Sequence, residues 1–388
     1  MKKSFLAFLL MMVSLAGYSQ TPSEGVPSIF NVPAKDYPCV DAEGRATFQV
    51  YAPEAELVQV DICSKKYPMT RDDKGVWMVT TDPLVVGFHY YFIIIDGVSV
   101  ADPSSDSFFG CGVMASGIEI PEAPEVAAYY TFNKNVPHGQ VRECQYWSEI
   151  EQAMRRCFVY TPADYDKSSK KYPVLYLQHG GGENEYGWPE QGKTGLIMDN
   201  LIAEGKSEEF IIVMDNGTWA RPRPAAGQMP ARPQGQRGQG MGLPSNWADG
   251  FMNTLINDII PMVDSRYRTI ADRKHRAMAG LSMGGMQTKA ITMKNPDVFS
   301  ALGIFSGGII TAEEAAQTEG FKEAYKLVFL SYGSRELENP RYGGNQKEII
   351  DELKASGVNA HFYVSPETAH EWQTWRRSLY QFAQLLFK

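Results

Sequence analysis

Residues 141–388 alternate short apolar runs with segments of helical spacing, and this alternation constrains the fold more than any other feature. The apolar runs are rich in β-branched and aromatic residues, which favour strands. Strands that alternate with helices form a mostly parallel sheet covered by helices on both faces. The runs are RRCFVYTP, YPVLYLQHG, EFIIVMDNG, HRAMAGLS, SALGIFSGG, KLVFLSYGS and VNAHFYVSP. The sequence therefore predicts an α/β domain over 141–388.

Residues 28–112 have a different hydrophobic pattern, in which apolar and polar residues alternate over short segments separated by residue pairs that favour turns. The segments are ATFQVYAP, LVQVDIC, GVWMVTT and FHYYFIIIDGVSV. Several short strands at this spacing predict an immunoglobulin-like β-sandwich. Residues 113–140 carry several prolines and no clear period, so we interpret them as a linker. A chain of 388 residues has room for these two domains.

The first twenty residues have the pattern of a secretory signal peptide. Lys2 and Lys3 precede an apolar stretch over 5–15, and small residues follow it. An apolar stretch of this length is too short to cross a bilayer, which argues against the alternative of a membrane anchor. We therefore expect cleavage at the end of 1–20 and a secreted or periplasmic protein without a membrane span.

Charge and cysteine content exclude several classes of function. The net charge is −8 and the chain has no basic tract, so we expect no nucleic-acid partner. The five cysteines form no C-x-x-C pair, which argues against a zinc site and against a dense disulfide framework. One or two disulfides remain open in an oxidising compartment, and the candidates join Cys39 to Cys63 or Cys111. The sequence implies no metal and no cofactor.

Ser282 lies between Gly280 and Gly284, where an apolar run meets a segment of helical spacing. Strand, sharp turn and helix are the context of a nucleophile elbow, in which only small residues fit beside the serine. The alternative is an ordinary glycine-rich turn. Active sites of parallel sheets lie at the carboxyl ends of the strands, and Ser282 follows such an end. This position favours a nucleophile.

A serine nucleophile needs a base to accept its proton and an acid to orient that base. His370 follows the last predicted strand, whereas His361 lies within that strand and is expected to be structural. Glu336 is the first carboxylate after the preceding strand, which gives the chain order serine, acid, histidine. The sequence thus predicts a triad of Ser282, His370 and Glu336, and the fallback acids are Glu338, Asp351 and Glu367.

An oxyanion hole needs two backbone N–H donors. We expect one from Met283, directly after the nucleophile, and the other from Gly181 or Gly182 in LQHGGGENEYGW. A glycine run lets the backbone approach a carbonyl oxygen closely. His179, at the start of this run, is expected to shape the loop.

Residues 221–245 are rich in Gly, Pro, Gln and Arg and cannot form a core element. They follow the run EFIIVMDNG, so they leave the same edge of the predicted sheet as the serine. Two interpretations stay open, a flap over the substrate site and an insertion without a role.

Several longer motifs resemble a known family: VPHGQVRECQYWS, RRCFVYTPADYD, LQHGGGENEYGW, GLSMGGMQT and SPETAHEWQTWRRSLYQF. From about residue 136 onward the chain resembles the esterase D-like branch of carbohydrate esterase family 1, which includes feruloyl and acetyl xylan esterases. The segments ATFQVYAPEAELVQVDI, GVWMVTTDPL and HYYFIIIDGVSVADP resemble a family-48-type carbohydrate-binding (early-set) module.

The resemblance implies an α/β-hydrolase fold and hydrolysis of feruloyl or acetyl esters on plant xylan, with feruloylated arabinoxylan or a small ester as substrate. It carries over to Ser282, His370 and the glycine loop. Many relatives have aspartate where Glu336 stands and glycine where Glu367 stands, so a second carboxylate could perturb or replace the triad acid. Trp188 and Trp219 are candidate walls for an aromatic acyl group.

Two rival functions remain. A siderophore (enterobactin-type) esterase also joins an early-set module to this kind of hydrolase, and Arg221 or Arg223 could bind its catecholate substrate. Such an enzyme is usually cytoplasmic, which the predicted signal peptide argues against. The second rival is a non-catalytic polysaccharide-binding protein. Trp77, Tyr90 and Tyr91 could stack on sugar, although aromatic residues of a β-sandwich more often lie in its core.

Overall fold

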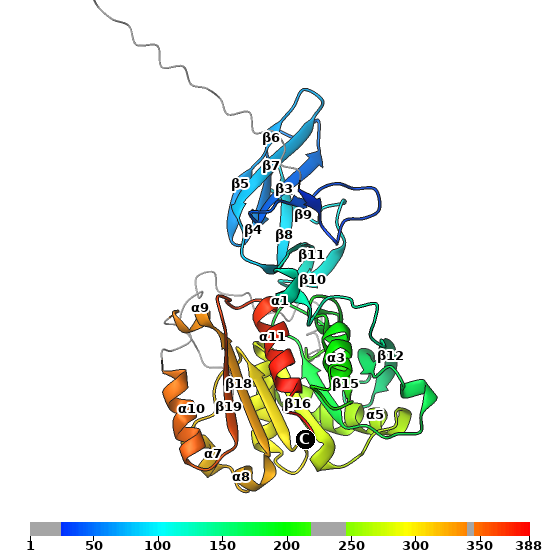
Figure 1. Ribbon diagram of the computed structural model, residues 1–388, viewed down its shortest axis with the longest axis vertical. Coiled ribbons are helices and arrows are strands. Elements are labelled where there is room, and N and C mark those ends of the chain that lie inside the picture. Colours follow the sequence, from blue (N-terminus) through cyan, green and yellow to red (C-terminus); the bar gives the residue numbers. More distant parts are fainter. Residues whose placement is uncertain (1–24, 219–245, 340–344) are drawn as a thin grey trace, which may run out of the picture.

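The computed structural model describes residues 25–218, 246–339 and 345–388. Three expectations fall outside these ranges: the signal peptide over 1–20, the substrate wall at Trp219, and the insertion over 221–245 with the candidate residues Arg221 and Arg223. In the part of the chain that the structure describes, no helix has the length and apolarity needed to cross a membrane. Figure 1 shows an N-terminal region of strands, over 25–120, that contacts a larger part built of strands and helices, from residue 140 onward.

The larger part contains an eight-stranded sheet in the order β12-β13-β15-β14-β16-β17-β18-β19. Pairings from β15 to β19 are parallel, and β13 pairs antiparallel with both β12 and β15. The strands are β12 (Gln140–Ser148), β13 (Ala153–Thr161), β14 (Val174–Gln178), β15 (Ile211–Asp215), β16 (Arg276–Leu281), β17 (Ala301–Phe305), β18 (Leu327–Gly333) and β19 (Ala360–Ser365). The predicted α/β sheet is therefore present, with an antiparallel hairpin at one edge.

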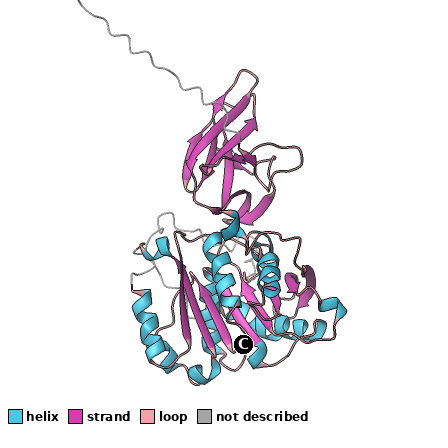
Figure 2. Cartoon of the chain, viewed as in Figure 1, coloured by secondary structure: helices cyan, strands magenta, loops and turns pink. Residues whose placement is uncertain are grey.

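Helices cover both faces of this sheet (Figure 2). They are α2 (Gly187–Glu190), α3 (Thr194–Ala203), α4 (Asp249–Thr254), α5 (Ile260–Arg266), α6 (Met283–Lys294), α7 (Ala312–Gln317), α8 (Phe321–Ala324), α9 (Ser334–Leu337), α10 (Gln346–Ala355) and α11 (Trp372–Ala383). Successive strand residues face opposite sides. In β14, Val174 and Tyr176 pack with α4 to α6 and α10, whereas Leu175 and Leu177 pack with α3 and α11.

The N-terminal region contains two sheets, in the orders β1-β2-β3-β7-β6 and β10-β11-β8-β4-β5, with β9 paired to β8. Their inner faces share one hydrophobic core, in which Trp77 and Tyr91 are buried as the core interpretation expects. The strands are β1 (Val26–Pro27), β2 (Cys39–Val40), β3 (Arg45–Tyr51), β4 (Val58–Ile62), β5 (Lys65–Pro68), β6 (Thr70–Arg71), β7 (Val76–Pro83), β8 (Gly87–Ile95), β9 (Val98–Val100), β10 (Ser107–Gly110) and β11 (Val113–Ile120).

In this region one expectation is wrong, and a possibility that the sequence left open is not realised. The predicted linker over 113–140 begins with a strand, because β11 pairs with β8 and β10 and buries its last six residues. Only the remainder, which holds the short helix α1 (Pro124–Ala127), connects the two parts. All five cysteines carry free thiols, and Cys39 is buried while Cys63 and Cys111 are exposed, so neither candidate disulfide is present.

The two parts of the chain share a core and a buried ion pair. Phe30, Phe88 and Phe108 of the N-terminal region belong to the same hydrophobic cluster as α3 and α11. Beside them Arg376 of α11 is fully buried, and its Nη1 and Nη2 atoms lie 2.7 and 3.0 Å from the two carboxylate oxygens of Glu119 in β11. Apolar burial and this bidentate pair therefore hold the N-terminal region against the helical layer.

We expect Arg376→Met to destabilise the protein strongly, because it leaves the Glu119 carboxylate buried without its partner. Breaking a buried pair in this way costs about 3–5 kcal/mol. The measurement is the midpoint of urea unfolding at neutral pH. Lys347→Met is the control, since it breaks the solvent-exposed pair with Asp351 and should leave the midpoint unchanged. Equal midpoints for Arg376→Met and the wild type would contradict the assigned role of this pair.

Candidate active site

Ser282 occupies a strained turn between β16 and α6. Its φ of 50° and ψ of −114° lie outside the regions that non-glycine residues usually adopt. A Cβ at residue 280 would lie 2.5 Å from the carbonyl oxygen of Gly284, and one at residue 284 would lie 2.6 Å from that of His179. The flanking glycines are therefore required by close backbone packing. The turn has the geometry that the sequence predicts for a nucleophile elbow.

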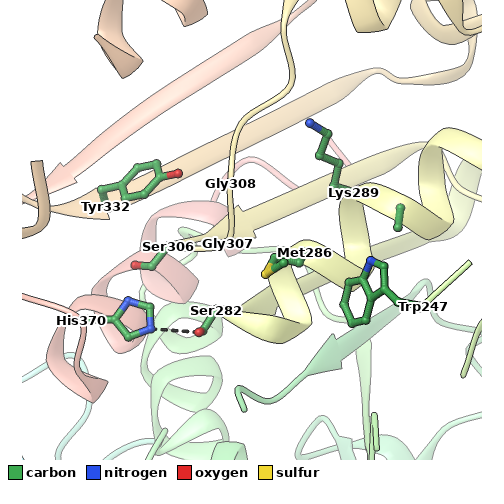
Figure 3. Close-up of a pocket in the computed structure, with 10 residues that line it drawn as sticks. Trp247, Ser282, Met286, Lys289, Ser306, Gly307, Gly308, Tyr332 and His370 are labelled. Atoms are coloured by element: carbon green, nitrogen blue, oxygen red, sulfur yellow. Dashed lines mark hydrogen bonds between the residues drawn. The ribbon is translucent and has the colours of Figure 1, made fainter. Parts of the chain in front are cut away.

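The structure brings His370 to Ser282 across the edge of the sheet (Figure 3). His370 lies between β19 and α11, and its Nε2 is 2.9 Å from the Ser282 Oγ. Its Nδ1 is 2.7 Å from a carboxylate oxygen of Glu336. A carboxylate only accepts hydrogen bonds, so Nδ1 carries the proton and Nε2 accepts from the serine hydroxyl. The three predicted residues thus form one hydrogen-bond chain in the required order.

Glu336 is held rigidly in the first turn of α9, directly after β18. Only 2% of its surface is exposed. One carboxylate oxygen faces His370, and the other accepts hydrogen bonds at 2.7 Å from the Ser306 hydroxyl and from the Gly333 N–H. The Trp375 indole N–H donates in turn to Ser306 at 3.1 Å. These partners fix the carboxylate plane, so the histidine ring is fixed as well.

The fallback acids lie elsewhere. Glu338, Asp351 and Glu367 are all exposed, and Asp351 pairs with Lys347. Glu367 has a φ of 57°, a conformation that favours glycine. His361 lies within β19, as expected for a structural histidine.

The glycine loop passes beside the nucleophile. The His179 Nδ1–H donates to the Gly180 carbonyl at 2.7 Å, and the Gly217 N–H donates to its Nε2 at 3.0 Å, as expected for a residue that shapes the loop. Burial lowers the pKa of His179 below its ordinary value, so the ring stays neutral. A Cβ at residue 181 would lie 3.9 Å from the Met283 Cβ, so the two residues expected to carry the N–H donors are neighbours.

Gly182 differs from its neighbour because it faces the N-terminal region. Its φ is 82°, and its carbonyl accepts a hydrogen bond of 2.8 Å from the Gly112 N–H. A Cβ at residue 182 would lie 3.0 Å from that nitrogen. Of the two expected glycines, Gly181 therefore has the better position for an oxyanion donor.

Two cavities meet at His370. One of about 600 Å³ contains Ser282 and is lined by Trp247, Met286, Lys289 and Tyr332 (Figure 3). The other has a volume of about 750 Å³ and contains Gly181. Its walls come from both parts of the chain, and they include Cys63, His89, Tyr90, Cys111, Arg335 and Trp372. An ester bound at Ser282 thus has room on both sides of the scissile bond.

Sequence reasoning missed most of these lining residues. Met286 could have been found, because it lies one helical turn after Ser282 on α6 and therefore on the same face. Tyr90 was singled out only as an aromatic residue of the β-sandwich, and Trp247 and the other lining residues of the N-terminal region had no local signal, since only the tertiary fold brings them to the site.

The expectation that Trp188 forms a substrate wall is wrong. Its side chain is 1% exposed, and its ring packs edge-on against Phe305 and Trp372. Its indole N–H donates to the Gln178 carbonyl at 2.8 Å. The ring fills the core beneath the glycine loop, so a substrate cannot reach it.

Comparisons with known proteins identify similar esterases. The family model described as "Putative esterase" matches residues 148–385, which is more than half of the chain. The chain is 42% identical to the endo-1,4-β-xylanase/feruloyl esterase of Xylanibacter ruminicola, over 94% of this chain and 47% of that protein. It is 27% identical to endo-1,4-β-xylanase Y of Acetivibrio thermocellus, over 57% of this chain and 21% of that protein. The chain thus spans half or less of these relatives.

Solved structures show the same fold. The ferulic acid esterase of Anaeromyces mucronatus, from carbohydrate esterase family 1, has a TM-score of 0.53 and 24% identity, over 67% of this chain and 94% of that chain. The enterobactin esterase of Shigella flexneri has a TM-score of 0.61 and 17% identity, over 88% of this chain and 92% of that chain. The fold of the larger part is therefore that of α/β-hydrolase esterases. From the family match and the site geometry together, we conclude that the chain belongs to this esterase family and is a carboxylic ester hydrolase.

Proposed function

We propose that this protein is a secreted serine esterase that hydrolyses feruloyl esters on plant xylan. The observation that carries the mechanism is the hydrogen-bond chain from Ser282 through His370 to Glu336. The substrate class rests on the 42% identity to a xylanase/feruloyl esterase. Secretion rests on the pattern of residues 1–20.

Acylation follows from the positions of the three side chains. The Ser282 Oγ attacks the ester carbonyl while the His370 Nε2 takes its proton. Glu336 holds the imidazole and stabilises its cation, because its carboxylate lies 2.7 Å from Nδ1. The N–H groups of Met283 and Gly181 bind the developing oxyanion. His370 then gives its proton to the leaving sugar oxygen, and water cleaves the acyl-enzyme by the same route.

The cavity beside Ser282 suits an aromatic acyl group. Trp247, Met286 and Tyr332 give it a largely apolar and aromatic wall, against which a hydroxycinnamoyl ring can stack. The cavity on the other side of His370 then takes the sugar alcohol. Its wall contains polar groups of both parts of the chain, which can hydrogen-bond to hydroxyls.

A siderophore esterase is the second candidate function. It is favoured by the similarity to an enterobactin esterase, which extends over 88% of this chain and so includes the N-terminal region. Arg335 lines the cavity at the junction of the two parts and offers a cation for a catecholate. The choice between the candidates is a question of substrate, because both use the same serine chemistry.

The first test compares the mature wild type with Ser282→Ala on methyl ferulate and p-nitrophenyl acetate. We expect turnover of ferulate to fall by about 10⁴-fold or more in the variant, because the nucleophile is lost. Turnover of acetate alone would indicate an acetyl xylan esterase. Serine-dependent hydrolysis of enterobactin but of neither ester would favour the siderophore function. Absence of serine-dependent hydrolysis of all three would point to a polysaccharide-binding protein.

Glu336→Gln should lower kcat by about 10²- to 10⁴-fold, because the amide removes the charge that stabilises the imidazolium. Initial rates at saturating p-nitrophenyl acetate measure this loss. Glu338→Gln, two residues later and exposed, should leave kcat unchanged. A full rate in Glu336→Gln together with a loss in Glu367→Gln would transfer the role of triad acid to Glu367.

Trp247→Ala should raise KM for methyl ferulate about tenfold, because the ring provides a stacking surface worth about 1 kcal/mol or more. KM for p-nitrophenyl acetate should change little, since an acetyl group does not fill the cavity. An equal rise for both esters would place the aromatic acyl group elsewhere.

A further inference from the structure

The loop that carries Gly181 is closed into a tight turn by Glu183. The Glu183 N–H donates to the Gly180 carbonyl at 3.3 Å, and the Glu183 carboxylate accepts from the Gly180 N–H at 3.3 Å. The side chain is 8% exposed, so it lies inside the protein and not in solvent. Residues 180–183 thus form a ring in which one carboxylate fixes the turn that carries the oxyanion donor.

Tyr90 of the N-terminal region holds this carboxylate from the other side. Its hydroxyl donates to Glu183 Oε1 at 3.1 Å. The Tyr90 hydroxyl oxygen itself accepts hydrogen bonds from the Gln191 side-chain amide at 2.8 Å and from the Trp372 indole N–H at 3.1 Å. Because both of these groups are donors, the single hydroxyl proton must point to Glu183.

The position of the Tyr90 ring is fixed by its neighbours in the N-terminal sheet. A Cβ at residue 110 would lie 2.6 Å from the Tyr90 oxygen, so only glycine leaves room for the ring against β10. Phe88 packs edge-on against the same ring, with centroids 4.9 Å apart. The hydroxyl therefore reaches the carboxylate from a rigid sheet.

A second contact joins the same turn to the N-terminal region. The Gly112 N–H, in the turn between β10 and β11, donates to the Gly182 carbonyl at 2.8 Å. This bond and the Tyr90 bond hold the two residues that follow Gly181. Both donors come from a part of the chain that supplies none of the three triad residues.

The geometry points to Tyr90 and the Gly112 amide as positioning groups that hold the 180–183 turn so that the Gly181 N–H faces the oxyanion at Ser282. An oxyanion donor acts only when it is aimed before the reaction, and a run of three glycines has more backbone freedom than any other sequence. The two hydrogen bonds remove that freedom. The inference rests on the proposed serine hydrolysis, and it does not depend on the identity of the acyl group.

Tyr90→Phe tests the inference directly, because it keeps the ring and removes the hydroxyl. We expect kcat for p-nitrophenyl acetate to fall about tenfold with KM within about twofold, since a displaced donor weakens only the transition state. Tyr91→Phe is the matched control: its buried hydroxyl donates to Asp102 within the N-terminal region and has no contact with the turn. A normal kcat in Tyr90→Phe, or an equal fall in both variants, would overturn the inference.

Variants of Glu183 give a second, independent measurement. Glu183→Gln keeps only one of the two acceptor oxygens and should lower kcat about as much as Tyr90→Phe, whereas Glu183→Leu cannot accept from either donor and should lower it further. Equal rates in these two variants would contradict the positioning role.

The rate at which a fluorophosphonate labels Ser282 keeps the inference testable if the ester assays fail. The phosphonyl oxygen takes the place of the oxyanion, so Tyr90→Phe should be labelled about tenfold more slowly than Tyr91→Phe. Labelling of the wild type without turnover of ferulate would reject the proposed substrate and leave the inference standing. Equal labelling rates in the two tyrosine variants would reject the inference alone.

Discussion

The rest of the active site depends on one backbone constraint, the positive φ of Ser282. The turn places the hydroxyl above the edge of the sheet and aims the first amides of α6 toward the same space. Such a conformation is costly and persists only where its surroundings leave no alternative. Here Gly280 and Gly284 touch each other's backbone and that of His179, so the strain is held by packing that no larger residue permits.

The parallel register of the sheet then supplies the partners of the serine. Strands β16, β18 and β19 end at the same edge, and the residues that follow them are Ser282, Glu336 and His370. The order of these residues in the chain carries little information about distance. The sheet places three loops side by side, and the buried Ser306 hydroxyl and Gly333 amide turn the Glu336 carboxylate toward the ring. The arrangement of the three residues thus follows from the strand order of the sheet and from the two hydrogen bonds that orient the Glu336 carboxylate.

The features of the fold and the site that could be predicted from the sequence are those that a local sequence pattern determines. The elbow at Ser282 and the positions of His370 and Glu336 could be predicted because each depends on local pattern: a glycine pair, or a polar residue after a buried strand. Burial of Trp188 could not, since an aromatic residue after a glycine run has the same local pattern in a core and in a cleft. The linker prediction failed at β11 because GVMASGIEI has weak alternation, and its strand forms through pairing with β8. The walls of the two cavities, apart from Met286, are brought together only by the tertiary fold.

The two parts of this chain depend on each other physically, although the family match begins only at residue 148. Glu119 neutralises Arg376 of α11. This helix begins at Trp372, two residues after His370. Without the N-terminal region that guanidinium would lose its counter-ion, and α11 would lose the aromatic cluster against which it packs. The 180–183 turn would also lose the hydrogen bonds that Gly112 and Tyr90 donate to its last two residues. His370 and the glycine loop therefore both rest on a framework that the N-terminal sheets complete, so in this chain those sheets belong to the scaffold of the proposed active site.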